Sequence, residues 1–397
     1  MDYRTLVANL AGDADGIVFD VHSLYAHFLR LRDRRQRQGL RYPLALILVA
    51  ATLAKLCGAD TPRAIADWVR ARQALLLEAF QVPYPRMPSH NTYRRVLGWA
   101  VALTDLEAQV SAFWQHWPDV SRAVRVTLDG KTLRGTIAVG QTRGLHLLAA
   151  FLPEAGVVLL QVEVEPGTNE IPVAGQVLKV LDLRGKIVTG DALLTQREVA
   201  EVIVAGGGEY VLTVKENQPR LYQDIAQLFA PEVYVPGFSP APPDFRTATT
   251  VNKGHGRLET RRLTSSSLLN ETCDWPGLGQ VFRLERETRR LTTGEVRQQV
   301  AYGVTSLTAA EAGPLDLLAW VRGHWAIENS LHYRRDVSFQ EDAGRTHHWN
   351  LAHALAVLNN LALALLLHAG QGSLPRARRF FGAHPDEALR LLLCRPA

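Results

Sequence analysis

The hydrophobic pattern in the first third of the chain is that of helices. A long apolar run begins at Pro43, a residue that favours the first turn of a helix. Thr61-Pro62-Arg63 is typical of an N-cap and first turn. No strand pattern precedes residue 118, so residues 1–118 are expected to form an all-helical N-terminal domain. The predicted helices cover residues 43–56, 61–72, 88–95 and 106–114.

At Ala123 the pattern changes to alternating apolar and polar residues. Three strands are followed by helix, strand, helix, strand and helix, which is the order of a ribonuclease-H-like α/β core. In that order the first and fourth strands are neighbours, so the acids that end them, Asp129 and Asp191, are expected side by side. The predicted elements are strands 124–129, 145–151 and 157–164, helix 170–181, strand 185–191, helix 195–204, strand 210–214 and helix 221–229.

A β-rich insertion is predicted at residues 230–307. Strand patterns occur at 258–263, 281–288 and 298–304, after proline-rich turns. A helix over 314–333 and a long helix over 352–367 follow, within a C-terminal helical region at 345–397. The expected architecture is a helical domain followed by a ribonuclease-H-like catalytic domain over 119–397. The prolines of the turns are Pro231, Pro236, Pro240, Pro242 and Pro243.

Composition indicates a folded, soluble protein. Of 397 residues, 47% are hydrophobic and 21% charged, which excludes a disordered chain. The three cysteines lack zinc-ligand spacing and form no disulfide framework, so a reducing cytoplasm is expected, with the protein at the nucleoid. The N-terminus lacks signal-peptide order. The apolar runs 43–56 and 351–367 are too short or interrupted by polar residues, and are interpreted as buried helices rather than membrane spans.

The net charge of +5 is weak evidence for a nucleic-acid partner, so the placement of the arginines matters more. A basic run precedes the first apolar helix, and Arg94 and Arg95 lie in another predicted helix. A solvated helix face and a phosphate-binding surface explain the run equally well. The run comprises Arg30, Arg32, Arg34, Arg35 and Arg37.

Glu328 stands in a segment rich in arginine and histidine, and is a candidate third acid beside Asp129 and Asp191. Phosphodiester cleavage by two metal ions requires carboxylates that hold the ions roughly 3.5–4 Å apart. Carboxylate oxygens suit Mg²⁺ or Mn²⁺. Three other acids in the same region are alternatives for the third position, although a structural role suits them better: Asp336, Glu341 and Asp342.

Three blocks containing these acids resemble the catalytic blocks of bacterial DDE transposases. They are Leu128-Asp-Gly-Lys-Thr-Leu-Arg-Gly135, Thr189-Gly-Asp-Ala-Leu-Leu-Thr-Gln196 and His324-Trp-Ala-Ile-Glu-Asn-Ser-Leu-His332. The group they resemble is that of the ISAs-one insertion sequences and H-repeat-associated proteins, in the IS-four superfamily. Supporting blocks are Lys215-Glu-Asn-Gln218, Gly254-His-Gly-Arg257 and residues 336–342, and resemblance extends over about residues 20–370.

The resemblance implies a transposase that binds the terminal repeats of its element and catalyses metal-dependent strand cleavage and strand transfer. Asp129, Asp191 and Glu328 would hold two Mg²⁺ or Mn²⁺ ions. The partners would be double-stranded DNA, as transposon ends and target, and a second copy of the chain on DNA, with no membrane. The β-rich insertion would help to hold the DNA end.

The superfamily's Tyr-Arg-Glu-Lys signature is not fully kept, because Val321 and His324 occupy the first two positions and Arg335 the last. Arg322 is an alternative phosphate clamp. Trp325 could stack on a flipped base, but its spacing to Ile327 and Leu331 favours a core residue. The candidate DNA-binding residues are Arg322, His324, Trp325, Arg335, Lys215, Asn217, Arg257, Arg34, Arg35 and Arg94.

Three other functions remain open on the sequence. A ribonuclease-H-like nuclease would cleave DNA without transposing it. An inactive relic would only bind DNA. An unrelated phosphohydrolase could use Asp191 as its nucleophile, but would leave the helical domain and the basic runs without a function.

Overall fold

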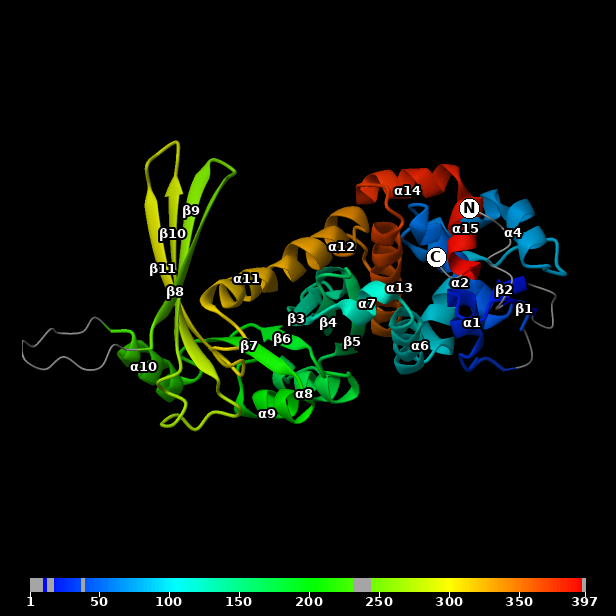
Figure 1. Ribbon diagram of the computed structural model, residues 1–397. Helices are drawn as coiled ribbons and strands as arrows, with labels where there is room; N and C mark the ends of the chain where they lie inside the picture. Colours follow the sequence, from blue (N-terminus) through cyan, green and yellow to red (C-terminus); the bar gives the residue numbers. More distant parts are fainter. Residues whose placement is uncertain (1–9, 13–17, 37–39, 231–243, 395–397) are drawn as a thin grey trace, which may run out of the picture. The chain divides into compact units, whose positions relative to one another are not determined.

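The computed structural model describes residues 10–12, 18–36, 40–230 and 244–394. Arg37 of the basic run and the five prolines between 231 and 243 lie outside the described residues. Figure 1 labels the elements along the chain. Nine strands form one mixed sheet in the order β5-β4-β3-β6-β7-β11-β10-β9-β8. Its first five members have the predicted ribonuclease-H-like order, and β3 and β6, the first and fourth strands of that core, are neighbours.

Two compact units make up the chain. The first comprises Met1–Ala123, Lys131–Glu163 and Glu328–Ala397; the second comprises Val124–Gly130 and Val164–Ile327. The predicted helical character of the N-terminal region is confirmed. Its helices are α1 (Leu24–Leu29), α2 (Leu44–Leu56), α3 (Pro62–Ala71), α4 (Gln73–Ala79), α5 (His90–Arg95), the π-helix η2 (Val96–Ala100), α6 (Leu103–Gln115) and α7 (Pro118–Arg122). Thr61 caps α3 as predicted, since its hydroxyl accepts from the Ala64 amide.

Two apolar helices from distant parts of the sequence form the centre of the first unit. Every residue of α2 is buried, and α13 (Trp349–His368) packs against α2, α6, η2 and strand β5 (Val157–Glu163). Helix α13 is the one described helix long and apolar enough to cross a membrane, and 83% of its apolar window is buried within the structure. It is therefore a core helix, as its polar interruptions predicted.

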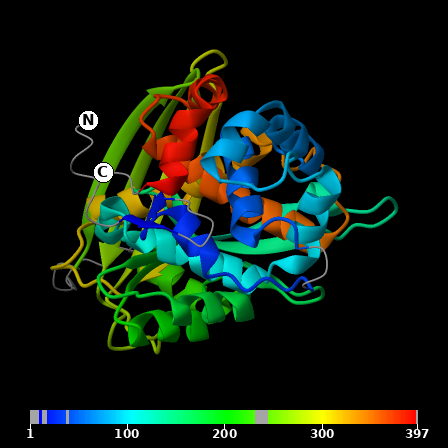
Figure 2. The same cartoon turned by 90° about the vertical axis from the view of Figure 1, so that its right-hand side faces the viewer.

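The second unit is a sheet covered by helices. Helices α8 (Glu170–Val180) and α9 (Arg197–Ala205) pack together, as Figure 2 also shows in green. Helix α11 (Pro314–His324) packs against β6 (Ile187–Gly190), β7 (Glu209–Val214), β8 and β9. Helix α10 (Pro219–Leu228) packs against β10 and β11. Leu317, Leu318 and Val321 of α11 join Val211, Leu263 and Phe282 of the sheet in one apolar core.

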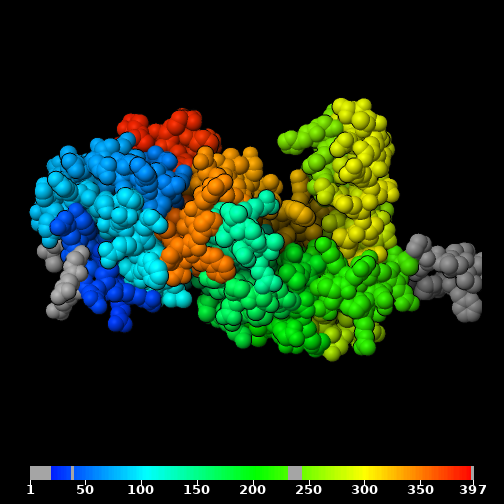
Figure 3. Space-filling view, turned by 180° about the vertical axis from the view of Figure 1, so that it is seen from behind, coloured from blue at the N-terminus to red at the C-terminus, as the bar shows by residue number. Residues whose placement is uncertain are grey.

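The β-rich insertion is confirmed as four long antiparallel strands. They are β8 (Arg246–Gly254), β9 (Arg257–Ser266), β10 (Gln280–Arg290) and β11 (Val296–Thr305). Their outer ends rise above the rest of the second unit, in yellow in Figure 3. Strand β8 was not predicted, because Arg246-Thr-Ala-Thr-Thr-Val alternates between half-buried and exposed small residues rather than showing a strongly apolar face.

Several boundaries differ from those predicted. A two-stranded ribbon of β1 (Leu10–Gly12) and β2 (Val18–Asp20) precedes α1, where no strand was expected. Strand β3 (Arg125–Leu133) does not end at Asp129 but continues beside β4 (Leu145–Leu152), because Leu133 is buried with Leu145 and Leu147.

The C-terminal third also differs. The helix predicted over 314–333 is interrupted: α11 ends at His324, Trp325 caps it, and a π-helix, η4 (Glu328–His332), leads into α12 (Tyr333–Ser338). The predicted C-terminal helical region at 345–397 is confirmed, since α13 is followed by α14 (Leu374–Ala383) and α15 (Pro385–Leu393).

Candidate active site

The backbone register of β3 and β6 brings two of the predicted acids to the same level of the sheet. The strands are parallel, with Val126 opposite Val188 and Thr127 opposite Thr189. Asp129 and Asp191 each follow two residues after that last pair. The buried Thr189 hydroxyl donates to Thr127 Oγ1 at 3.1 Å just below them. One carboxylate therefore stands within β3 and the other directly after the end of the adjacent strand β6, as expected from the order of the elements.

The loop that carries Asp191 is fixed by several hydrogen bonds. Asp191 Oδ1 accepts from the Leu194 amide at 3.2 Å. Asn217 Nδ2 donates to the Ala192 carbonyl at 2.6 Å, and Gln218 Nε2 donates to the Thr195 carbonyl at 3.1 Å. The Lys215-Glu-Asn-Gln218 block therefore supports the Asp191 loop. Asn217 was predicted to contact DNA, but its amide nitrogen is used for this support.

His324, at the end of α11, belongs to the same cluster. Its Nδ1 lies 3.4 Å from Thr189 Oγ1. Burial lowers the pKa of His324 below its usual range, and the negative charges of Asp129 and Asp191 partly oppose that shift. Burial therefore favours the neutral imidazole, which would contact a phosphate by hydrogen bonding rather than as the cation that the signature suggested.

The donor chemistry of this cluster fits a hard divalent cation. Asp129 is half-buried and Asp191 exposed, so their carboxylates face a region that water and substrate can reach. Mg²⁺ is held in proteins by few carboxylates and keeps several waters. Among the described residues, no three His, Cys, Asp or Glu side chains gather closely enough to hold a metal ion by themselves. Asp129 and Asp191 would thus supply protein ligands to an ion completed by water or phosphate oxygens.

Glu328, the third predicted acid, begins the π-helix η4 in the first unit. Its side chain is exposed, while Leu331 and His332 of the same turn are buried. Single π-helical turns are rare and often occur at functional sites. The wider turn follows the break at Trp325, which no sequence period indicated.

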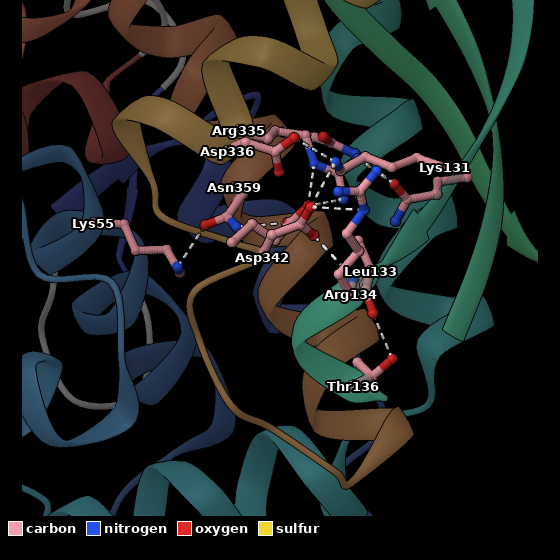
Figure 4. A network of polar contacts seen from close by, with 12 residues as sticks. Lys55, Lys131, Leu133, Arg134, Thr136, Arg335, Asp336, Asp342 and Asn359 are labelled. Carbon is pink, nitrogen blue, oxygen red and sulfur yellow. Dashed lines mark hydrogen bonds and ion pairs between the residues drawn. The ribbon is translucent and has the colours of Figure 1, made fainter. Parts of the chain in front are cut away.

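The three alternative acids are all engaged in ion pairs of the first unit, and Figure 4 labels two of them, Asp336 and Asp342. Asp336 Oδ2 lies 2.7 Å from Lys131 Nζ, and Asp342 Oδ2 lies 3.8 Å from the same nitrogen. Glu341 lies 2.7 Å from Arg335 and accepts from Asn359 at 2.8 Å. Their structural role, which the sequence favoured, agrees with these contacts.

Arg335 corrects one prediction. Its side chain is 1% exposed, and its guanidinium contacts Glu341 and donates to Gln161 Oε1 at 3.0 Å. A fully buried guanidinium paired in this way cannot also bind a DNA phosphate. The position that the superfamily signature assigns to a basic clamp is therefore occupied here by a structural residue.

Trp325 corrects a second prediction. The interpretation as a core tryptophan is wrong, because the side chain is 67% exposed. The helix stops at His324, so the regular spacing to Ile327 and Leu331 no longer places the three side chains on one face. One turn earlier, exposed Arg322 donates to Asn252 Oδ1 of β8 at 3.3 Å. Arg322 and Trp325 keep the exposure that contact with DNA requires.

The remaining candidates in the second unit lie at the ends of strands. Lys215 is exposed directly after β7. Arg257 is exposed and begins β9, after a two-residue turn in which His255 and Gly256 both have positive φ. Such a turn joins two antiparallel strands with the natural twist of a hairpin. The Gly254-His-Gly-Arg257 block therefore builds a hairpin tip that presents Arg257.

The candidates in the N-terminal region differ in availability. Arg34 and Arg94 are exposed. Arg35 is engaged within the protein, because its guanidinium pairs with Asp33 at 2.6 Å and donates to the Tyr42 carbonyl at 2.7 Å. It therefore shapes the loop before α2 rather than offering its charge to a phosphate. The sequence did not distinguish a solvated surface from a phosphate-binding surface for the basic run. In the structure Arg34 is exposed, whereas Arg35 is paired within the protein.

Lys131 was missed in the sequence. It is the third residue of Asp129-Gly-Lys131, and its ion pairs with Asp336 and Asp342 join strand β3 to the region after Glu328 within the first unit. The sequence could have indicated Lys131 through its position on the strand. It lies two residues after Asp129, and residues two apart on a strand share a face.

Comparison with known proteins assigns the chain to a class. Residues 122–365 match the transposase DDE domain family, and residues 25–113 match the DDE_Tnp_1-associated family. The chain is 30% identical over 356 residues to a protein of Escherichia coli O157:H7 named "Putative transposase YncI", covering 87% of each. It is 27% identical over 360 residues to "H repeat-associated putative transposase YhhI" of Escherichia coli K12, covering 87% of this chain and 91% of that one.

The chain belongs to the DDE transposase family. A solved structure of the piggyBac transposase synaptic complex with hairpin DNA is similar at a TM-score of 0.41 and 12% identity, covering 92% of this chain and 78% of that one.

Proposed function

We propose that this protein is an active DNA transposase of the H-repeat-associated, ISAs-one type, which binds the terminal repeats of its insertion sequence and catalyses strand cleavage and strand transfer. The observation that carries the proposal is the parallel β3–β6 pair, with Asp129 and Asp191 two residues beyond matched threonines. Membership of the DDE family supplies the class of reaction.

In this proposal Asp129 and Asp191 bind divalent cations, and Glu328 is the third acid. The choice of Glu328 rests on its motif, His324-Trp-Ala-Ile-Glu328, and on its exposure in a π-helical turn. Two Mg²⁺ or Mn²⁺ ions, when bound, activate the attacking water or hydroxyl and stabilise the leaving oxygen of the phosphodiester. Asn217 and Gln218 keep the Asp191 loop in place, and neutral His324 can donate a hydrogen bond to a phosphate oxygen.

DNA is held by exposed basic and aromatic side chains in this proposal. Arg322 and Trp325 lie at the end of α11, close in sequence to His324, and Arg257 lies at the β8–β9 hairpin tip. Arg34 and Arg94 would extend the contact to the helical N-terminal region. Cationic contacts of this kind give an affinity that falls steeply with salt concentration.

The test uses purified full-length protein and labelled linear DNA that carries the inverted repeats flanking the coding sequence. With Mg²⁺ or Mn²⁺ and a supercoiled target plasmid, we expect cleavage at the repeat end and joined strand-transfer products. Glu328→Gln should abolish both while it keeps binding to the repeat. Glu311→Gln changes an exposed glutamate whose carboxylate accepts from Thr308, and is the matched control.

Two outcomes would replace the proposal. Cleavage without joined products would indicate a nuclease. Binding without cleavage under any divalent metal would indicate an inactive DNA-binding protein.

A further inference from the structure

An ion pair between a buried lysine and a partly exposed aspartate connects the chain that follows Asp129 with the chain that follows Glu328. Lys131 Nζ lies 2.7 Å from Asp336 Oδ2, and the lysine side chain is only 9% exposed. A lysine so far removed from water needs a charged partner, because an unpaired ammonium in that position loses its hydration without compensation. The ion pair therefore restrains the two segments that it joins within the first unit (Figure 4).

The positions of the two partners in the sequence give the pair its meaning. Lys131 is two residues after Asp129 on β3, so the two side chains leave the same face of that strand. Asp336 lies in α12, which continues directly from η4, the turn that begins with Glu328. The ion pair thus joins strand β3 to the helical segment of Glu328.

Backbone contacts hold the same two segments together just beyond the ion pair. The Arg134 amide donates to Asp342 Oδ1 at 3.0 Å, and the Thr346 amide donates to the Gly135 carbonyl at 3.1 Å. A Cβ atom on Gly135 would collide with the Gly344 carbonyl oxygen. Only glycine allows this close approach, so the 3₁₀ turn that follows β3 (Arg134–Thr136) packs directly against the chain after α12.

A second set of contacts fixes the far side of the segment. Glu341 binds Arg335 and accepts from Asn359 Nδ2 at 2.8 Å, and Asn359 Oδ1 accepts from Lys55 Nζ at 2.6 Å. Asn359 lies in α13 and Lys55 in α2, the two central helices. The Glu328 segment is therefore tied to the rigid core by Arg335 and Glu341, and to β3 by Lys131.

We propose that Lys131 is a positioning residue for the proposed strand-cleavage reaction, and that it acts through Asp336 to hold the η4–α12 segment, and with it Glu328, against strand β3. This inference rests on the proposed function. It assigns Lys131 to a carboxylate rather than to a DNA phosphate, and it explains why Asp336 follows the third acid without serving as a metal ligand.

The first measurement does not depend on activity. Hydrogen exchange of the amides of residues 328–338 is compared in the wild type, Lys131→Met and Arg184→Met. Arg184 forms an ion pair with Asp182 at 2.8 Å in which both side chains are exposed, so it is a matched control for loss of a cation. We expect exchange in this segment to be about 10-fold faster in Lys131→Met and unchanged in Arg184→Met.

The second measurement separates positioning from direct DNA contact. We expect Lys131→Met to slow single-turnover cleavage by about 10- to 100-fold, as small misplacements of reacting groups do. Binding to the terminal repeat and its salt dependence should be unchanged. Lys131→Arg should restore most of the rate, because arginine keeps the charge, and Asp336→Asn should reproduce the loss. The double variant Lys131→Met/Asp336→Asn should be no slower than either single variant.

The outcomes that overturn the inference are distinct. Weaker binding with a salt slope smaller by about one would make Lys131 a phosphate contact. If Lys131→Met cleaves DNA and exchanges its amides at the same rates as Arg184→Met, Lys131 has no positioning role. If Lys131→Met does not fold, Lys131→Arg and Asp336→Asn decide on the same criteria. If neither the wild type nor Arg184→Met cleaves DNA, the proposed function fails. Unchanged hydrogen exchange in Lys131→Met would then also show that Lys131 does not restrain residues 328–338.

Discussion

The segments that carry the proposed acids are held in place by different means. The main-chain pairing of the parallel strands β3 and β6 places Asp129 and Asp191 at matching positions along the sheet. This pairing needs no particular side chain beyond the two buried threonines. Glu328 stands in a π-helical turn whose continuation is held by Arg335, Lys131 and their acids. Backbone register tolerates substitution of a side chain, whereas a buried ionic network does not. The two regions should therefore respond differently to mutation.

The largest expected effect is on catalysis at the strand pair. Asp129→Asn or Asp191→Asn should lower strand cleavage by at least about 10²- to 10³-fold, because an amide is a poor ligand for a hard cation. The thermal midpoint should hardly change, since the amide oxygen introduced by Asp191→Asn can still accept from the Leu194 amide. Asp182→Asn, in an exposed pair, is the control. Cleavage by both active-site variants at the wild-type rate would contradict the assignment.

The ionic network should respond in the opposite way, by losing stability. Arg335→Met leaves Glu341 buried without its cation, and should destabilise the fold by about 3–5 kcal/mol. Arg335→Met/Glu341→Met should recover part of this loss, because no uncompensated charge remains. Urea unfolding of both variants measures the difference. A double variant less stable than the single one would show that Arg335 acts through Gln161 rather than through Glu341.

A smaller effect is expected at Trp325, which lies between the two regions in sequence. Trp325→Ala should weaken binding to the terminal repeat by about 1–3 kcal/mol if the exposed ring stacks on a base, and Trp325→Phe should lose less. Fluorescence anisotropy with labelled repeat DNA measures both. Trp99, which is 70% exposed and contacts the His348 ring, is a control for removal of an exposed tryptophan. Equal affinity of Trp325→Ala and wild type would exclude stacking.

The smallest effect concerns pH and the core of the first unit. Burial lowers the pKa of His27 from 6.5 to about 4, with Arg30 adding to the shift. Above pH 6.5 the ring is neutral both folded and unfolded. As pH falls from 6.5 toward 4, the unfolded chain takes up a proton that the folded chain does not, so stability is lost. His27→Gln should lose less stability than the wild type between about pH 7 and 5 in urea titrations. An identical loss would contradict the role of His27.

The fold could be predicted from the sequence wherever periodicity decided it. The order of strands and helices placed Asp129 beside Asp191, because alternation and apolar runs reflect burial directly. The π-helix at Glu328, the exposure of Trp325 and the burial of Arg335 could not be predicted in this way. The first two follow from the end of α11 at His324, and the third from Gln161, a partner of Arg335 that is 174 residues away in the chain.

The use of basic residues was the least predictable feature. Arginines look alike in sequence, yet Arg34 is exposed while its neighbour Arg35 is bound to Asp33 and Tyr42. Lys131 and Arg335 carry the same charge as Arg322, but their partners make them structural. Whether a cation can bind DNA is decided by the carboxylates within reach, and these come both from nearby positions in the chain, as Asp33 does for Arg35, and from distant ones, as Asp336 does for Lys131.

The pairing of α2 with α13 sets the order in which this protein can be made. Helix α2 is complete at residue 56, but the helix that covers it begins only at residue 349. At a synthesis rate of about 5–20 residues per second, an apolar helix waits roughly 15–60 s on the ribosome for its partner. During that interval α2 can pack only against its neighbours from the same end of the chain, such as α1 and α3. A polypeptide interrupted before α13 would leave the face of α2 that α13 covers exposed, and we expect it to be more open to proteolysis than the full chain.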